Sequence, residues 1–500
     1  MNRPTLATSI WVALAMASSA TWGQAPATED SFGYHRPTEQ LVQRGMQAFM
    51  ICNGLFVSER PLELIYEQEL GLNERPIVPP SDVRVDEKLK AVTVGRAGND
   101  PVPQMRAAFR EGLGCVVMSP GQTLSNLEDL PRLDMAPLAG DAADIDWPDG
   151  DRRASAAPGP QIDVAALATA SDWAFDRAGN GGHKSQITLS LLVVSGGKIV
   201  HERYAPGVDR TTRTRTWSTA KSIAATLVGI LVAEDELELD APLPFDDWLP
   251  TTAADDPRRQ ITLRDVLQMS SGLYPIDNER GSVTGSNLSY FAGTSSVAGA
   301  LDRGLVRAPG THWDYENYDT LLAVHAMETV LSDILTYLEF PRRALLDRIG
   351  MRSTVPGVDR FGNFVLSSQV YTNARDLARF GLLYLNEGRW GDEQIIPPNW
   401  VDFVRTPAPA TRERGNIYGA QFWLVPDDFT SIPPDAYSTA GNRGQYAVIV
   451  PSYGLVIVRR GLDQLPGKHR FSQWELTREV LKAFSEKPWG AKPTATAADR

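Results

Sequence analysis

Two pairs of short apolar runs mark the chain, one around residue 196 and one around residue 452. Residues 187–194 and 198–204 flank Ser195-Gly196-Gly197, and residues 446–450 and 455–460 flank a turn that begins at Pro451. Apolar runs of this length around a short turn rich in Gly, Pro and Ser are typical of β-hairpins. The sequence therefore predicts one hairpin before the middle of the chain and another near its end.

Before and between these hairpins the apolar positions follow the period of helices. The run at 218–233 is apolar on all sides, which predicts a buried helix. Strands early and late with helices between them indicate an α+β fold, in which an antiparallel sheet flanked by helices carries a helical insertion subdomain. The expected helices cover residues 164–175, 218–233, 261–269, 318–327 and 376–385, and Gly388 closes the last.

The first part of the chain has a different pattern and predicts an N-terminal accessory region over residues 24–140. Alternation at 83–94 predicts strand, and residues 104–112 predict a helix. Residues 141–160 are rich in Asp, Ala, Pro and Gly, which is typical of a linker. We expect the main domain over 161–485 and a flexible tail over 486–500.

The chain begins with the features of a secretory signal peptide, which we place at residues 1–23. Asn2 and Arg3 precede an apolar run over residues 6–17, and small residues follow it. The run is too short for a membrane anchor, which needs about 20 apolar residues. We therefore expect an exported protein that is periplasmic or secreted, with no membrane span in the mature chain.

Composition narrows the classes of partner. The formal net charge of -12 argues against nucleic acid or an anionic membrane surface as a partner. The two cysteines, Cys52 and Cys115, are too few for a four-thiolate zinc site. In an oxidising compartment they can form a disulfide, which would stabilise the fold by about 4 kcal/mol, and the alternative is two buried free thiols.

The pattern Ser-x-x-Lys occurs twice, in different settings. At Ser195 it falls in the turn of a predicted hairpin, where two glycines leave no fixed geometry. At Ser218 it opens the buried helix, so that Ser218 and Lys221 share one helix face. The helix N-terminus adds a backbone N–H and a positive dipole end, which suit a developing oxyanion.

A lysine that activates a serine needs further partners, because a free lysine with a pKa near 10.4 is almost fully protonated at neutral pH. The sequence offers Tyr315-Glu316-Asn317 at the start of a predicted helix. Tyr315 can relay protons with Lys221, and the Asn317 amide can hydrogen-bond the lysine or a substrate. Together these residues form a candidate nucleophilic site.

The Ser-x-x-Lys motif at Ser218 and the motif Tyr315-Glu316-Asn317 follow each other in this order, with the segment 261–273 between them. This arrangement resembles that of the penicillin-recognising serine hydrolases. That family includes class C β-lactamases, D-alanyl-D-alanine carboxypeptidases, related esterases and 6-aminohexanoate-dimer hydrolases. The resemblance covers about residues 165–485 and implies a serine β-lactamase-like fold. It also implies that Ser218 is acylated, that Lys221 is its base and that Tyr315 relays a proton to the leaving group.

The family's third motif, Lys-Thr-Gly or His-x-Gly, does not occur in this sequence. In its place stands a segment similar to the Gly-x-x-Gly-Gln of the 6-aminohexanoate-dimer hydrolase branch. By this match the backbone N–H groups of Ser218 and Asn442 form the oxyanion hole, and Arg443 is a candidate replacement for the missing cation. The candidate substrate-binding residues are Trp217, Asn317, Gly441, Arg443, Gly444 and Gln445.

The sequence predicts a serine hydrolase that cleaves a small-molecule amide or ester and needs no cofactor or metal. It contains neither the Gly-x-Ser-x-Gly of α/β-hydrolases nor the His-Glu-x-x-His of zinc proteases. Two alternatives stay open. One is a β-lactamase or D-alanyl-D-alanine carboxypeptidase, and the other is a non-catalytic binding protein of the cell envelope. The sequence does not indicate an oligomeric state.

Overall fold

The computed structural model describes most of the chain between residues 36 and 484. The expected signal peptide at 1–23 and tail at 486–500 lie outside the described residues, as do residues 154–160 of the expected linker. The described ranges are 36–70, 78–98, 100–153, 161–248, 253–276, 285–331, 333–464 and 469–484.

A six-stranded antiparallel sheet joins the two ends of the main domain. The pairing of β15 with β5, which places Leu455 opposite Ser195, sets the late hairpin beside the early one. Both predicted hairpins are confirmed. In sheet order the strands are β12 (Trp423–Leu424), β13 (Tyr437–Gly441), β14 (Gln445–Val450), β15 (Leu455–Gly461), β5 (Thr188–Ser195) and β6 (Lys198–Tyr204).

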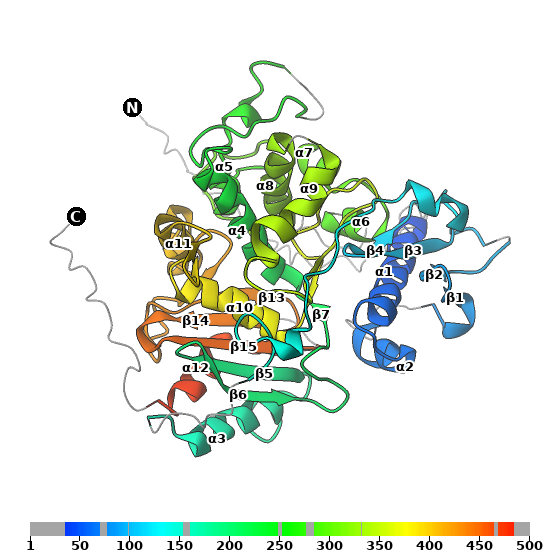
Figure 1. The fold of residues 1–500 in the computed structure, drawn as a ribbon. Coiled ribbons are helices and arrows are strands. Elements are labelled where there is room, and N and C mark those ends of the chain that lie inside the picture. Colours follow the sequence, from blue (N-terminus) through cyan, green and yellow to red (C-terminus); the bar gives the residue numbers. More distant parts are fainter. Residues whose placement is uncertain are drawn as a thin grey trace, which may run out of the picture.

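Both faces of this sheet are covered by helices (Figure 1). Leu191 and Val193 pack in the cluster of α3 (Val164–Phe175) and α12 (Gln473–Leu481). Leu192 and Val194 point the other way, into the cluster that contains α10 (Ala374–Leu385). Successive side chains of a strand face opposite sides, so a strand covered on both faces is apolar throughout.

Most of the helices lie on the α10 side and form the expected insertion, so the α+β prediction is confirmed. The innermost is α4, which is buried over nearly its whole length as its sequence predicts. These helices are α4 (Ala220–Ala233), α5 (Leu263–Leu267), α6 (Ser286–Phe291), α7 (Ser296–Leu301), α8 (Asn317–Val330), α9 (Ile334–Phe340) and α11 (Pro398–Arg405). Short strands beside them are β7 (Thr214–Arg215), β8 (Val355–Pro356), β9 (Val370–Thr372), β10 (Arg389–Trp390) and β11 (Glu393–Gln394).

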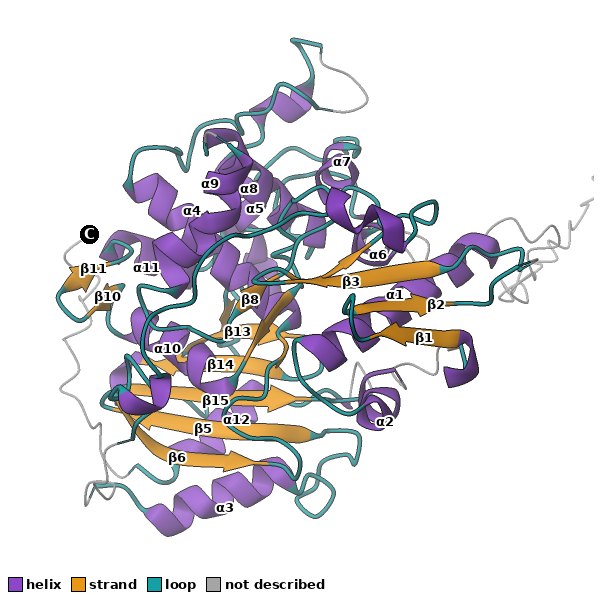
Figure 2. Cartoon of the chain, turned by 45° about the vertical axis from the view of Figure 1, so that its right-hand side comes forward, coloured by secondary structure: helices purple, strands orange, loops and turns teal. Residues whose placement is uncertain are grey.

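The N-terminal region is a four-stranded sheet crossed by one long helix (Figure 2). The strand prediction at 83–94 is confirmed, whereas the helix prediction at 104–112 is wrong because β3 pairs on both edges with neighbouring strands. A disulfide joins Cys52 in the helix to Cys115 in β4. The elements are α1 (Arg36–Phe56), α2 (Leu62–Leu64), the π-helical turn η1 (Ile65–Leu70), β1 (Val83–Asp86), β2 (Ala91–Val94), β3 (Met105–Arg110) and β4 (Gly114–Val117).

The accessory region shares its hydrophobic core with the helical part of the main domain. Phe49 of α1 packs edge-on against Phe291 of α6, at a centroid distance of 5.9 Å. Gly45 permits this approach, because a Cβ atom there would lie 1.6 Å from the backbone oxygen of Phe291. The N-terminal region is therefore docked through direct contact of two helix backbones.

Residues 141–153, in the expected linker, are held against α10. Arg379 of α10 donates hydrogen bonds to the backbone oxygens of Pro148 and Gly150 and pairs with Asp151 at 2.8 Å. This part of the chain is an extended crossing fixed to the main domain.

Within the described part of the chain, no helix combines the length and the apolar character that crossing a bilayer requires.

We predict that Gly45→Ala destabilises the protein, although alanine favours helix over glycine by about 1 kcal/mol. The added methyl group meets a rigid backbone oxygen, so α1 and α6 must separate, and we expect the free energy of unfolding to fall by about 1–3 kcal/mol. Urea denaturation of the purified protein measures the change. Gly304→Ala is the control, because a Cβ atom at residue 304 meets nothing within 4 Å. Equal stability of the two variants would contradict the docking contact.

Candidate active site

Ser218 lies in a tight turn, η6 (Trp217–Thr219), that leads directly into α4. Lys221 is in the first turn of that helix, and its Nζ donates a hydrogen bond of 3.2 Å to Ser218 Oγ. The spacing of three residues thus brings amine and hydroxyl together.

Lys221 is 1% exposed and donates to acceptors from three separate parts of the fold. Besides Ser218 these are Oδ1 of Asn317, at the start of α8, and the backbone oxygen of Ser367, 2.8 Å away. A buried amine without acceptors would cost several kcal/mol, so these bonds fix the position of Nζ.

Tyr315 lies beside the lysine, with Lys221 Nζ 5.1 Å from the centre of its ring. Its ring packs against Trp313, Tyr418 and Trp423, at centroid distances of 5.4–6.1 Å. The segment 261–273 supports this loop, since the backbone oxygen of Met269 accepts a 3.0 Å hydrogen bond from Asp314 N. Tyr315 is therefore fixed from both sides.

A buried ion pair anchors the helix that carries Asn317. Asp319 accepts hydrogen bonds of 2.9 Å from Ser271 Oγ and from Arg303 Nη2. Burial raises the pKa of the Asp319 carboxyl, and the Arg303 guanidinium opposes this shift. The anchor fixes the first turn of α8 and with it the Asn317 amide.

The loop between β13 and β14 approaches the turn of Ser218. A Cβ atom on Gly441 would lie 2.0 Å from the backbone oxygen of Thr216, so only glycine fits there. Thr219 Oγ1 also donates a 3.0 Å hydrogen bond to the backbone oxygen of Gln445. Asn442, at the tip of the loop, is exposed and lines the same cavity as Ser218.

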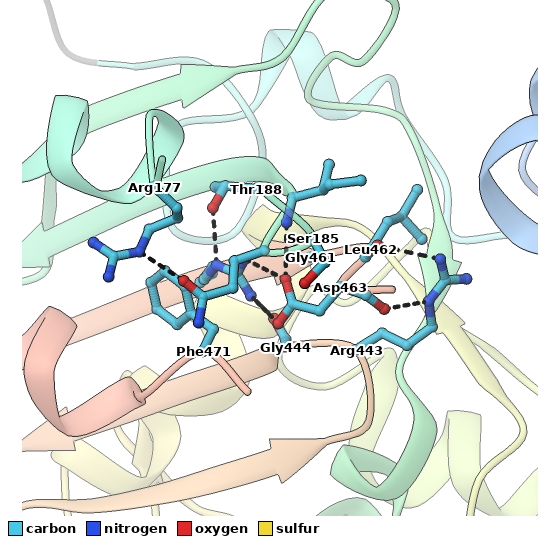
Figure 3. Close-up of polar contacts among 12 residues, drawn as sticks. Arg177, Ser185, Thr188, Arg443, Gly444, Gly461, Leu462, Asp463 and Phe471 are labelled. Atoms are coloured by element: carbon cyan, nitrogen blue, oxygen red, sulfur yellow. Dashed lines mark hydrogen bonds and ion pairs between the residues drawn. The ribbon is translucent and has the colours of Figure 1, made fainter. Parts of the chain in front are cut away.

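The three residues that follow Asn442 are Arg443, Gly444 and Gln445, and they make contacts inside the protein. Arg443 is 3% exposed, and its side chain donates to the backbone oxygens of Leu462 and Asp463, as Figure 3 shows. Burial lowers the pKa of its guanidinium, against the influence of Glu69 and Asp463. A Cβ atom on Gly444 would lie 1.7 Å from Arg459 Nη1.

The side chain of Gln445 is also hydrogen-bonded within the main sheet. Its side-chain amide donates to the backbone oxygen of Gly461, and its Oε1 accepts a 2.8 Å hydrogen bond from Arg460 Nε. Of the predicted substrate-binding residues, Gly441, Arg443, Gly444 and Gln445 thus make contacts within the protein, whereas Trp217 and Asn317 line the cavity. Asn442, which the sequence predicts as part of an oxyanion hole, lines it too.

Trp217 forms part of the cavity wall with an unusual backbone, at a φ of +51°. Its ring is stacked on the guanidinium of Arg215 at 3.9 Å. Arg215 Nη2 donates a 2.6 Å hydrogen bond to Oγ of Ser368, another lining residue. Burial lowers the pKa of this guanidinium, and Tyr371 opposes the shift.

The cavity has a volume of about 270 Å³ and includes residues that the motifs do not indicate. Met46 and Met50 come from α1, and Glu69 and Leu70 come from η1. Nothing in the sequence separates these residues from ordinary core positions of an amphipathic helix. The lining residues are Met46, Met50, Glu69, Leu70, Trp217, Ser218, Ser286, Asn287, Tyr290, Phe291, Asn317, Ser368 and Asn442.

Two features define the serine β-lactamase-like fold. One is the antiparallel sheet, and the other is the Ser-x-x-Lys sequence at the start of α4, the inner helix beside that sheet. The Beta-lactamase family model matches residues 176–481, so the chain belongs to that family and is an enzyme of the serine hydrolase class. A comparison with curated proteins finds no match.

Solved structures share this fold at low sequence identity. A proposed 6-aminohexanoate-dimer hydrolase from Bacillus anthracis is 21% identical, with a TM-score of 0.50 over 59% of this chain and 78% of that chain. A proposed beta-lactamase from Bacteroides dorei is 21% identical, with a TM-score of 0.52 over 65% of this chain and 100% of that one. A family VIII carboxylesterase is 16% identical, with a TM-score of 0.50 over 66% and 98% of the two chains.

We predict that Asn317→Asp shifts the pH dependence of the enzyme upward. The sequence predicts that Lys221 accepts the proton of Ser218. A carboxylate beside Lys221 Nζ favours the ammonium form, which cannot accept that proton. The acidic limb of the kcat/KM profile for a p-nitrophenyl ester is expected to move up by about 1–2 pH units.

The matched control is Asn287→Asp, which puts the same charge elsewhere in the cavity wall. An unshifted profile for Asn317→Asp, or the same shift in both variants, would contradict direct contact of residue 317 with the lysine.

Proposed function

We propose that this protein hydrolyses an amide or ester through an acyl-enzyme on Ser218. The observation that carries the proposal is the 3.2 Å hydrogen bond between Lys221 Nζ and Ser218 Oγ, made by an amine held at 1% exposure. The ammonium form donates all three of the bonds to Ser218, Asn317 and Ser367. In the uncharged form, two hydrogens stay on Asn317 Oδ1 and the Ser367 oxygen, and the lone pair faces Ser218 Oγ, where it can act as a base.

In the proposed reaction Lys221 accepts the Ser218 proton while Oγ bonds to the substrate carbonyl carbon. The carbonyl π electrons move to oxygen, and the backbone N–H groups of Ser218 and Asn442 stabilise the oxyanion. As the tetrahedral intermediate collapses, the scissile C–N or C–O bond breaks. The leaving group takes the proton from Lys221 through the Tyr315 hydroxyl.

Water then attacks the acyl-enzyme, and the same groups accept its proton. The new C–O bond to water replaces the bond to Ser218 Oγ, which leaves with a proton as the free hydroxyl. The products are a carboxylic acid and the amine or alcohol released in the first step. Every proton transfer in this proposal uses Lys221, which contacts Ser218, or Tyr315, whose ring lies beside Lys221.

We propose substrates like those of 6-aminohexanoate-dimer hydrolases and related esterases, ahead of β-lactams and D-alanyl-D-alanine peptides. The supporting observation is the orientation of Arg443, the candidate replacement for the missing cation. Its guanidinium is occupied by Gln68, Glu69, Leu462 and Asp463, and Arg443 is not among the lining residues. This loop therefore offers no cation to a substrate carboxylate, which counts against penicillins and D-alanyl-D-alanine peptides. It counts equally against the free carboxylate of 6-aminohexanoate dimer, so within this branch it favours esters.

We predict that a fluorophosphonate probe adds one covalent adduct to the wild-type protein and none to Ser218→Ala, as measured by intact mass. Ester turnover is expected to fall by about a million-fold, since no other group replaces the nucleophile. Ser195→Ala is the matched control, because it alters the other Ser-x-x-Lys sequence, and should keep the adduct. A wild-type protein that forms no adduct would overturn the proposal in favour of a non-catalytic binding protein.

The substrate class is tested by parallel turnover of 6-aminohexanoate dimer, short p-nitrophenyl esters, nitrocefin and a D-alanyl-D-alanine peptide. We expect hydrolysis of the dimer or the esters. Rapid hydrolysis of nitrocefin or of the peptide would replace this ranking by the β-lactamase or carboxypeptidase alternative.

We also propose that the protein is exported, which the disulfide between Cys52 and Cys115 supports because such bonds persist in oxidising compartments. Protein recovered from cell fractions is expected outside the cytoplasm, without the residues before about position 24. Alkylation under non-reducing conditions, read by mass spectrometry, should label neither cysteine. Full-length cytoplasmic protein with both thiols labelled would contradict export.

A further inference from the structure

The wall of the cavity opposite the family's own motifs comes from the N-terminal region. Met46, Met50, Glu69 and Leu70 line it, and all four precede residue 176, where the match to the Beta-lactamase family begins. The family domain alone thus does not enclose the space beside Ser218.

Three of the four side chains in this wall are apolar, and the fourth is Glu69. Met46 and Met50 are each 5% exposed, and Leu70 is 1% exposed. Trp217 and Phe291 continue the apolar surface from the main domain. Thioether side chains are flexible and polarizable, so they adapt to apolar groups of different shape.

The negative charge of the one acidic residue in the wall, Glu69, is balanced by neighbouring arginine side chains. Among the described lining residues, Glu69 alone carries a charge at neutral pH. Its carboxylate pairs with Arg60 Nη1 at 2.7 Å and with Arg443 Nη1 at 3.4 Å. Because two guanidinium groups face this one carboxylate, the wall favours an uncharged acyl chain, as in a simple ester, over the ammonium-bearing acyl half of 6-aminohexanoate dimer.

The same contacts fix the wall relative to the nucleophile. Arg443 Nη2 donates to the backbone oxygen of Gln68, which ties η1 to the loop that carries Asn442. On the other side, Gly45 sets α1 directly on α6, and Cys52 joins α1 to β4 two residues after Met50. The wall therefore has a defined distance from Ser218.

The cavity and Tyr315 lie in different surroundings. Trp313, Tyr418 and Trp423 surround the tyrosine ring, and neither they nor Tyr315 belong to the described lining of the cavity. Since the proposed reaction protonates the leaving group through Tyr315, the cavity is left for the acyl part of the substrate.

We propose that the N-terminal region is the acyl-selecting wall of this enzyme, and that it favours an apolar acyl chain of medium length. This inference rests on the proposed function. At about 30 Å³ per non-hydrogen atom, a cavity of about 270 Å³ holds about nine such atoms. That size corresponds to a hexanoyl or octanoyl group.

The test is a series of p-nitrophenyl esters from acetate through butanoate, hexanoate, octanoate and decanoate to dodecanoate. For the wild type, kcat/KM is expected to rise by about fourfold per methylene group up to hexanoate or octanoate and to fall beyond. Met50→Trp fills the cavity and should lower kcat/KM for octanoate by about tenfold or more while acetate changes little. Met50→Ala should move the optimum to a longer chain.

Val42→Ala is the matched control for Met50→Ala, because it shortens another buried side chain of α1 that does not line the cavity. It should lower stability and leave the chain-length profile unchanged. If Met50→Trp does not fold, as judged by its melting transition, Leu70→Trp makes the same test from η1.

Labelling of Ser218 by the fluorophosphonate probe separates the two proposals. If the wild type is labelled but shows no chain-length optimum, the proposal of an acyl-selecting wall is wrong and the acyl-enzyme proposal stands. The same holds if the Met50 and Leu70 variants keep the wild-type profile. A wild type that is not labelled overturns the acyl-enzyme and the wall with it.

Discussion

The rest of the site depends on the burial of one amine. Lys221 is almost fully removed from water, and an amine in that position needs hydrogen-bond acceptors around it. The acceptors come from the turn before α4, from the start of α8 and from the segment before β9. Satisfying a single nitrogen therefore requires three distant parts of the chain to meet. The Ser218 hydroxyl, as one of these acceptors, is placed by the same requirement.

A second constraint is the close approach of backbones around the site. Gly441 sets the end of β13 against Thr216, and Gly45 sets α1 against Phe291. Neither contact tolerates a side chain, and each defines one boundary of the space beside Ser218. The first places Asn442, and the second places Met46 and Met50, in the lining of the same cavity as Ser218. The cavity is thus shaped by two glycines that do not themselves line it.

The sequence predicts the main sheet well, because each hairpin combines two apolar runs with recognisable turn residues between them. It fails at 104–112, where Met105-Arg106-Ala107-Ala108 contains good helix formers, yet pairing on both edges makes the segment a strand. The contact between Ser218 and Lys221 can be predicted from the sequence because the two residues are only three positions apart. The roles of Met46, Met50 and Leu70 are not, because a pocket wall and a hydrophobic core require the same side chains. Arg443 shows the converse, since its sequence position suggests a substrate contact while its side chain binds η1 and the segment after β15.

The order of strands in the main sheet has a consequence for how the molecule forms. β5 pairs with β15, so an early strand acquires its inner neighbour only when nearly the whole chain is available. Pairing of positions so distant in sequence is slow, because a long loop must close before any contact compensates its entropy. Asn442 lies between β13 and β14, in the same late part of the chain, so a partly synthesised chain contains Ser218 and Lys221 without the loop that completes the cavity lining. The cavity beside Ser218 is therefore complete only once the last strands are present.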